Sequence, residues 1–477
     1  MVDKKYNLLF IPLLIVLFIL FLMGVFSYNE SKLNYIVFST IFFILLFYGI
    51  YKPITYSFLF LSIFLFLGFW FKLTVHLILD YSYVEPIGSF YSSNSSMDEV
   101  LVVSMIGAIA ILIVYFLFNF FNLNKTIKIF EDKNLYKKKQ IYNFYKKYKT
   151  FILYCLFFVI ILVSVLNVIL NIHLIGIVPT TIPIFPLNIL IYWLLNIGFV
   201  LIFSYFVYLE IKYEKLLNLS MIFLFLFVCA LCSIVILSRG SFIFLFSGML
   251  FFIVFNHKYF INYKISNIFK IILVAILLYV IVIYMVTILR DIYFNGMNIF
   301  NFKSVSGVSG VSGVSGVSGV FLGLIVDRWI GLEGVMSVVS YPFKSFDLFI
   351  DAFTSNPKIG NIDIYQYISN AHYKDMDNTK YAFATIPGSI AFFFYSGSYI
   401  LLFLGMFFLV SLMIMIEKII FFLSQSTLFV SLIGVLLASN VAQFGLAPIN
   451  LVKSLFMLFC FLVSVKFIEY YFNRYYK

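Results

Sequence analysis

The chain has 477 residues, of which 64% are hydrophobic and only 11% are charged. Soluble globular domains carry about 25% charged residues, so this composition excludes a soluble domain and predicts membrane-spanning helices. The formal net charge is +12, but the lysines lie in short loops between apolar segments. This distribution indicates membrane orientation by the positive-inside rule rather than a nucleic-acid partner.

Twelve apolar segments recur along the chain, and a membrane interior requires such segments to be helical because it offers no water to backbone groups. We therefore predict an all-α polytopic membrane protein. The first segment is too long for the apolar core of a signal peptide and lacks a small-residue cleavage site, so we expect it to be retained. The predicted spans are residues 7–27, 34–51, 55–79, 100–121, 151–170, 187–208, 218–237, 241–255, 271–289, 395–416, 427–445 and 450–468.

The loop between the fourth and fifth predicted spans sets the orientation. Residues 124–149 contain nine lysines against one glutamate and one aspartate, so the basic loop 122–150 is expected on the cytoplasmic side. Counting outward from it divides the chain into three parts. Residues 1–289 hold nine spans, residues 290–387 form one large outer loop, and residues 388–477 hold the last three spans.

The large outer loop contains an unusual repeat, SVSGVSGVSGVSGVSGV, at residues 304–320. Its three-residue period matches neither a strand nor a helix, so we expect a spacer in a tolerant loop. The alternatives are a small-residue helix or re-entrant segment packed on the bundle, and a further span over residues 304–326. The apolar stretches 320–326 and 334–343 predict short helices that rest on the membrane surface or cap the bundle.

No motif predicts a metal ion, a nucleotide or another cofactor. Cys229 and Cys232 form a C-x-x-C pair inside an apolar segment, where small buried side chains are the expected role. His76 and His173 stand isolated in the sequence, and no metal-ligand spacing occurs around them.

Cations at the predicted outer face are informative because the positive-inside rule does not explain them. Arg239 lies in the hairpin LSRGSF, Arg290 follows the ninth span, and Arg328 lies in DRWIGLEG. The guanidinium group pairs with phosphate through two parallel hydrogen bonds, so we predict that at least two of these arginines share an anion site. The alternative is lipid-headgroup contact or local pairing with Asp291 and Asp327.

Four further outer residues are weaker candidates. Glu333 stands between glycines in GLEG and is a candidate general base, a helix cap or a partner of Arg328. His372 in SNAHYKD is a candidate proton shuttle or a solvated surface histidine. Lys72 and Lys453 lie within the outer ends of the third and twelfth spans.

Three motifs carry a resemblance to a known family. They are SRG at 238–240, RWIGLEGVMSVVSYP at 328–342, and TIPGSIAFFFYSGS at 385–398. Together with many spans and one large outer loop, they resemble the Wzy-type polymerases of O-antigen and oligosaccharide repeat units. The resemblance implies a GT-C-like bundle in the bacterial inner membrane with an active site that faces the periplasm.

The resemblance also implies an activity, substrates and partners. Such enzymes polymerise repeat units linked to undecaprenyl pyrophosphate by metal-independent glycosyl transfer, alongside a chain-length regulator protein. In this chain, Arg239, Arg290 and Arg328 would bind the pyrophosphate and stabilise its departure. A base or orienting partner for the acceptor hydroxyl would come from Glu333, Asp291 or His372. The alternatives are a flippase or other transporter of lipid-linked oligosaccharide, an O-antigen ligase, and a non-catalytic membrane scaffold.

Overall fold

The computed structural model confirms an all-α membrane protein. Every segment predicted as a span is helical. Within the described residues, seven helices are long and apolar enough to cross a membrane, and the other predicted spans are shorter apolar helices. The exact number of spans and the GT-C-like arrangement stay predictions. The structure describes residues 4–93, 95–121, 135–184, 187–261, 264–295, 326–355, 364–371, 380–382, 385–445 and 448–475.

The described part of the first 295 residues contains two π-helices, η1 and η3, which interrupt longer α-helices. Its first elements are α1 (Lys4–Ser27), α2 (Lys32–Tyr51), α3 (Tyr56–Leu65), η1 (Phe66–Phe71), α4 (Lys72–Leu79), η2 (Phe90–Ser92) and α5 (Met97–Phe120). They are followed by α6 (Leu135–Leu170), β1 (Gly176–Ile177), α7 (Leu187–Trp193), η3 (Leu194–Gly198), α8 (Phe199–Glu214), α9 (Leu219–Val235), α10 (Arg239–Phe255), η4 (His257–Tyr259) and α11 (Ile265–Asn295).

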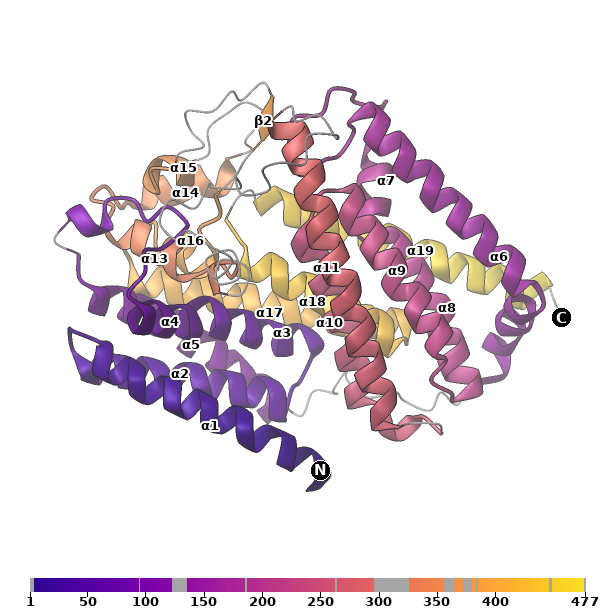
Figure 1. Cartoon of the computed structure of the whole chain (residues 1–477), viewed down its shortest axis with the longest axis horizontal. Helices are drawn as coiled ribbons and strands as arrows, with labels where there is room; N and C mark the ends of the chain where they lie inside the picture. Colours follow the sequence, from indigo (N-terminus) through magenta and orange to yellow (C-terminus); the bar gives the residue numbers. More distant parts are fainter. Residues whose placement is uncertain are drawn as a thin grey trace.

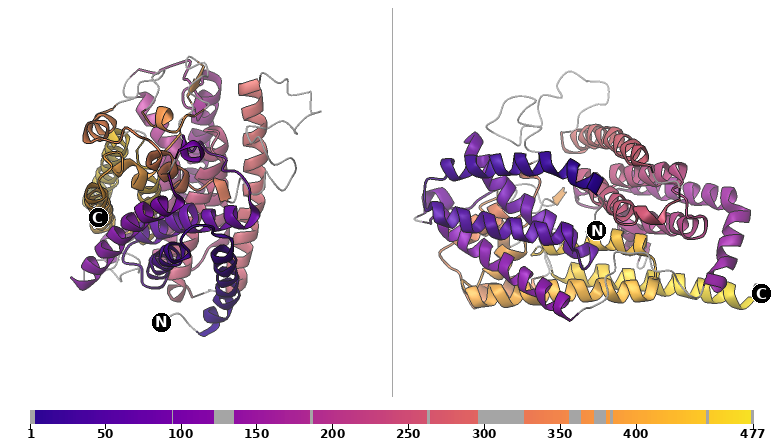
Figure 2. Two further views of the ribbon diagram at one scale, coloured as in Figure 1. Left: turned by 90° about the vertical axis from the view of Figure 1, so that its left-hand side faces the viewer. Right: turned by 90° about the horizontal axis from the view of Figure 1, so that it is seen from below.

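The C-terminal part holds short elements and then three long helices. These elements are α13 (Leu332–Val339), α14 (Phe346–Thr354), α15 (Ile364–Ile368), β2 (Tyr381–Ala382), α16 (Ser389–Phe393), α17 (Tyr399–Ser424), α18 (Thr427–Ala442) and α19 (Pro448–Tyr475). Helices α1 to α5 form one group and α6 to α11 another (Figure 1). The right-hand view of Figure 2 shows α17 to α19 lying along one side of both groups.

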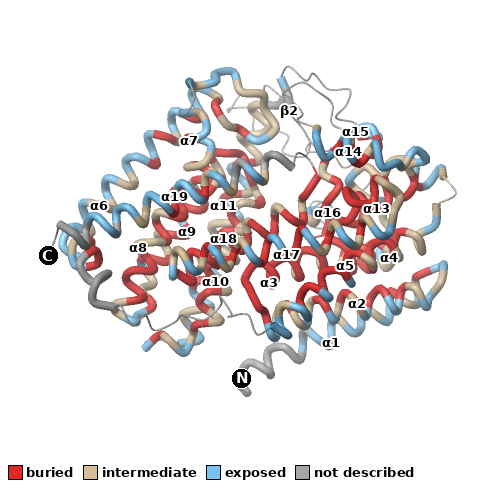
Figure 3. Tube along the Cα trace, turned by 180° about the vertical axis from the view of Figure 1, so that it is seen from behind, coloured by how far each residue is buried: buried red, intermediate tan, exposed pale blue. Residues whose placement is uncertain are grey.

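Helices α3 and α18 form the centre of the bundle and make its most extensive contact. Both are buried along nearly their whole length, as the red segments of Figure 3 show. Their backbones approach closely at Gly434, where an added Cβ would lie 2.6 Å from Tyr56 Cβ and 2.8 Å from Ser57 N. Small residues allow such close packing of helices inside membranes.

A buried carboxylate caps the same central helix. Glu417 of α17 is fully buried and accepts hydrogen bonds from the backbone N–H groups of Tyr56 at 2.8 Å and Ser57 at 2.6 Å. These donors belong to the first turn of α3, which has no intrahelical acceptors for them. The negative charge also complements the positive end of the helix. Glu417 therefore fixes α17 against α3.

Part of the predicted basic loop is helical. Helix α6 begins at Leu135, well before the predicted span 151–170, and has a non-helical residue at Tyr148. Its first turns pack on α8, where Lys149 Nζ lies 2.7 Å from Glu210 Oε1. Residues 141–149 are therefore held to α8 by aromatic packing and ion pairs.

Four segments that the sequence assigns to one side meet at one end of the bundle, which we call the loop end. Gly88 N–H donates to Ser369 O at 3.0 Å, Ile175 N–H to Ile236 O at 3.1 Å, and Val178 N–H to Lys380 O at 3.0 Å. Strands β1 and β2 also pair here. Helix α13 does not rest on the surface, the first of the two expectations for this stretch, because all eight of its residues are buried. The repeat at 304–320 lies outside the described residues.

Helix packing at Gly434 yields a stability prediction. We expect Gly434→Ala to lower the melting temperature of the detergent-purified protein, because the new methyl group overpacks the α3–α18 contact at a cost of about 1–3 kcal/mol. Gly240→Ala is the matched control, since the nearest atom to its Cβ is 3.4 Å away. Equal melting temperatures for the two variants would contradict this account.

Candidate functional site

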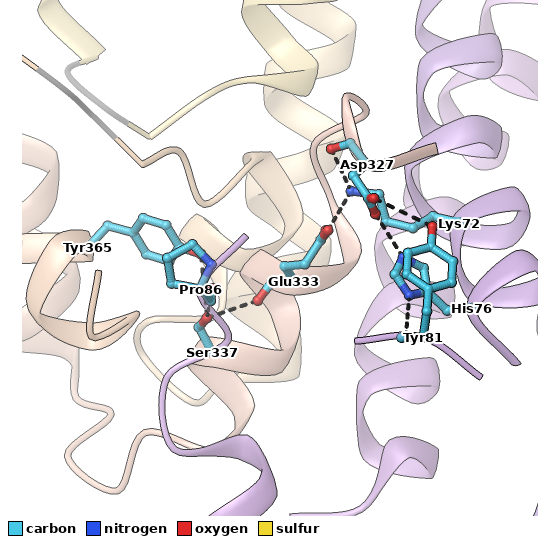
Figure 4. A network of polar contacts seen from close by, with 8 residues as sticks. All are labelled: Lys72, His76, Tyr81, Pro86, Asp327, Glu333, Ser337 and Tyr365. Carbon is cyan, nitrogen blue, oxygen red and sulfur yellow. Dashed lines mark hydrogen bonds and ion pairs between the residues drawn. The ribbon is translucent and has the colours of Figure 1, made fainter. Parts of the chain in front are cut away.

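A buried ion pair joins α4 to α13 at the loop end. Lys72 Nζ lies 2.5 Å from Glu333 Oε1, and the two side chains are 0% and 4% exposed. The same ammonium group donates to Asp327 O at 3.2 Å. Figure 4 shows Lys72 between the segment that carries Asp327 and the first turn of α13. Both charges are removed from water, so each depends on the other for its stability.

A second buried pair lies one helical turn further along α4. His76 Nε2 is 2.8 Å from Asp327 Oδ1, and its Nδ1 is 2.9 Å from Tyr81 O. The imidazole ring also stacks on Tyr81 and Tyr83, with centroid distances of 3.9 and 4.0 Å. The sequence suggested that His76 is isolated. The fold instead brings to it a carboxylate from 251 residues away.

Glycines allow the segment 326–331 to reach α4. A Cβ at Gly68, in the π-helix η1, would collide with Ile330 O. Gly331 has φ +157° and lies against Phe69, and a Cβ at Gly334 would collide with Pro387 O. π-Helical turns alter the local direction of side chains and are frequent at functional sites. Here η1 ends directly before Lys72 and so sets the position of the ion pair.

A large cavity of about 2220 Å³ opens beside these ion pairs. Its polar lining includes Lys72, Glu85, Asp327 and Glu333, and the amides of η3 and α18. Its apolar lining comes from α7, α11 and α19. Several of these apolar residues also face the outside of the protein, namely Leu190, Val280, Tyr284, Val452 and Phe456. The cavity therefore continues from a charged interior to an apolar outer surface.

All three predicted arginines line this cavity. Arg239 starts α10, and Arg328 lies over the first turn of that helix, since a Cβ at Gly240 would be 3.4 Å from its Nη2. The two guanidinium groups are close enough to repel each other. Within the described chain neither forms a hydrogen bond or an ion pair, and Arg239 Nε is buried without a partner.

Arg290 has a different environment. Its Nε and Nη2 donate to Leu237 O at 3.2 and 2.8 Å. Leu237 has φ +58°, a strained conformation for a residue with a side chain. Ser238 then caps α10 through its hydroxyl, which accepts from Ser241 N at 3.3 Å. Arg290 thus supports the turn that places Arg239.

Of the candidate bases, Glu333 lines the cavity and Asp291 does not. Glu333 pairs with Lys72 and not with Arg328, and Asp327 pairs with His76, so local pairing of Asp327 with Arg328 was wrong. Asp291 lies on α11 close enough to attract Arg239, but it is not part of the cavity lining. His372 lies outside the described residues, and so does the side chain of Lys453.

The sequence did not single out Glu85, which lines the cavity beside the ion pairs. The sequence also indicated no partner for His173. In the structure, Asn196 Nδ2 lies 2.9 Å from His173 Nε2, and both residues line the cavity. Burial lowers the pKa of His173 to about 4, so the ring is neutral near pH 7. No group of three or more His, Cys, Asp or Glu side chains that could hold a metal ion occurs within the described residues.

The Lys72–Glu333 pair can be tested by a double-mutant cycle. We expect Lys72→Met to cost about 3–5 kcal/mol of unfolding free energy, because it leaves a buried carboxylate unpaired. Glu333→Gln should also destabilise the protein, and the double variant should regain most of the loss. Thermal melts in detergent measure all three. Lys146→Met, which breaks the exposed pair with Glu214, should change little, and additive losses at Lys72 and Glu333 would argue against coupling.

Comparisons with known proteins do not identify the chain. No protein-family model, no curated protein sequence and no solved structure matches it. Its function must therefore be inferred from the cavity and its residues.

Proposed function

We propose that this protein polymerises oligosaccharide repeat units linked to undecaprenyl pyrophosphate, on the outer face of the bacterial inner membrane. One observation carries the proposal. Arg239 and Arg328 lie together, with no ion pair to either among the described residues, in a cavity that also has apolar walls. Two cations that repel each other gain stability from a bound anion, and pyrophosphate offers the geometry that guanidinium groups prefer.

The position of the arginines strengthens the anion site. Both lie at the N-terminal turn of α10, where unpaired backbone N–H groups and the helix dipole favour negative charge. The polyprenyl tail would follow the apolar wall formed by α11 and α19 toward the lipid. An amphipathic ligand with an anionic headgroup therefore fits both parts of the cavity.

The chemistry requires stabilisation of the leaving group. In glycosyl transfer from a lipid pyrophosphate, the bond between the sugar anomeric carbon and a phosphate oxygen breaks, and charge develops on that oxygen. Fixed guanidinium groups stabilise this charge without reorganisation during the reaction. Trp329, Asn440 and Gln443 also line the cavity and provide an aromatic face and amide groups of the kind that bind sugar hydroxyls.

A transporter of the same lipid-linked sugars is the second candidate. Buried ionisable residues within membrane helices are typical of transport and proton pathways, and Lys72 and His76 of α4 are such residues, paired with Glu333 and Asp327. A deletion strain separates the candidates through its surface glycan. A polymerase deletion leaves single repeat units on the gel, whereas loss of a flippase or ligase removes attached repeats altogether.

The arginine pair makes the sharpest functional prediction. We expect Arg239→Gln and Arg328→Gln each to abolish the long glycan ladder in the complemented deletion strain. The reason is that one lost donor to developing charge costs about 10²–10³-fold in rate. Protein level is measured by immunoblot of the membranes. Lys264→Gln, an exposed cation outside the cavity, should keep the ladder. Full ladders from both arginine variants would refute the anion site.

Arg290 should behave differently from the other two arginines. We expect Arg290→Gln to lower the melting temperature and the amount of protein in the membrane, because Leu237 O loses both donors. Its effect on the ladder should follow from the reduced amount. The measurement is a thermal melt of the purified variant beside Arg328→Gln, which should melt as the wild type does. A normal melt with a lost ladder would instead place Arg290 in the anion site.

A further inference from the structure

Glu85 is the one carboxylate in the cavity lining, among the residues described, that no ion pair or hydrogen bond occupies. Asp327 and Glu333 line the same cavity, but they are held by His76 and Lys72. Glu85 is accessible to solvent at the cavity, although the groups packed around it shield its carboxyl group from bulk water. A carboxylate in this state can accept a proton from a ligand.

The loop that carries Glu85 is fixed on both sides of it. Tyr83 stacks on His76 at 4.0 Å. Ser337 Oγ donates to Pro86 O at 3.1 Å, a contact drawn in Figure 4. Gly88, at φ +64°, donates to Ser369 O. The loop that carries Glu85 is therefore anchored to α4, to α13 and to Ser369 directly after α15. Rigid support of this kind is what a group needs in order to meet a reacting atom.

The charges around Glu85 adjust its proton affinity. Burial raises the pKa of its carboxyl group, and repulsion from Glu333 and Asp327 raises it further, while Lys72 and Arg328 oppose the shift. Tyr365 of α15 also faces it. A raised pKa makes the ionised carboxylate a stronger base near neutral pH.

We propose that Glu85, which the sequence did not single out, is the general base of the glycosyl transfer. This inference rests on the proposed function. The acceptor hydroxyl gives its proton to a Glu85 carboxylate oxygen, and its oxygen forms the new bond to the anomeric carbon. The bond from that carbon to the pyrophosphate oxygen breaks, and its electron pair leaves with the pyrophosphate beside Arg239 and Arg328.

The test uses the full-length protein in nanodiscs. The substrate is the lipid-linked oligosaccharide extracted from membranes of the deletion strain, and elongation is followed by gel and mass spectrometry between pH 5 and pH 9. Binding is measured separately as the thermal shift caused by undecaprenyl pyrophosphate. Glu85→Gln is the test variant. Asp80→Asn is the matched control, because Asp80 lies on the same loop, is exposed and does not line the cavity.

We expect Glu85→Gln to elongate about 10²–10⁴-fold more slowly than the wild type, the range by which a general base accelerates reactions. Its thermal shift with undecaprenyl pyrophosphate should be unchanged, and Asp80→Asn should match the wild type. The wild-type rate should rise with pH as Glu85 loses its proton, and this rise should be absent in Glu85→Gln.

Three results would overturn the assignment. Full elongation by Glu85→Gln with the wild-type pH profile would remove Glu85 from the reaction and leave the proposed function intact. Loss of elongation together with loss of the thermal shift would mean that Glu85 supports the structure instead. Absence of elongation by the wild type would refute the proposed function, and the role of Glu85 with it.

Discussion

The ion pair between Lys72 and Glu333 is the contact on which the loop end depends. An ammonium group and a carboxylate that are both removed from water must be paired, because an isolated charge in this environment carries a large desolvation penalty. Pairing these two residues, which lie 261 positions apart, forces the segment 326–339 into the bundle. Arg328 belongs to that segment and therefore lies over the first turn of α10, beside Arg239.

Close packing makes this insertion sterically feasible. Glycines at positions 68, 331 and 334 lie where a Cβ would meet backbone or an aromatic ring, and the π-helix η1 reorients the span directly before Lys72. The second π-helix, η3, carries Asn196 into the same cavity. Both interruptions in the membrane helices thus lie beside the charged cavity, where their freed backbone groups are sheltered by protein.

Charged residues at the loop end divide into two sets. Lys72 pairs with Glu333 and His76 with Asp327, and these contacts hold α4 to α13 and to the segment that carries Asp327. Arg239, Arg328 and Glu85 face the cavity without ion-pair partners among the described residues. The first set is satisfied by the fold itself, whereas the second keeps its charge available to a ligand. The proposed chemistry depends on this difference, because it uses the charged groups of the second set.

Hydropathy alone predicted an all-α membrane protein and where its apolar helices lie, because each membrane helix must satisfy its own backbone and present apolar side chains. Charge asymmetry likewise predicted which loops share one end. The sequence also predicted the three arginines as a group, since outer cations have no topological explanation. It could not assign partners over long separations, so it did not pair Glu333 with Lys72 or His76 with Asp327, and Glu85 was not considered. Those roles depend on which charged groups the tertiary fold buries next to each other. A charge buried beside its partner is neutralised by the protein, whereas a charge that lines the cavity without an ion-pair partner remains available to a ligand.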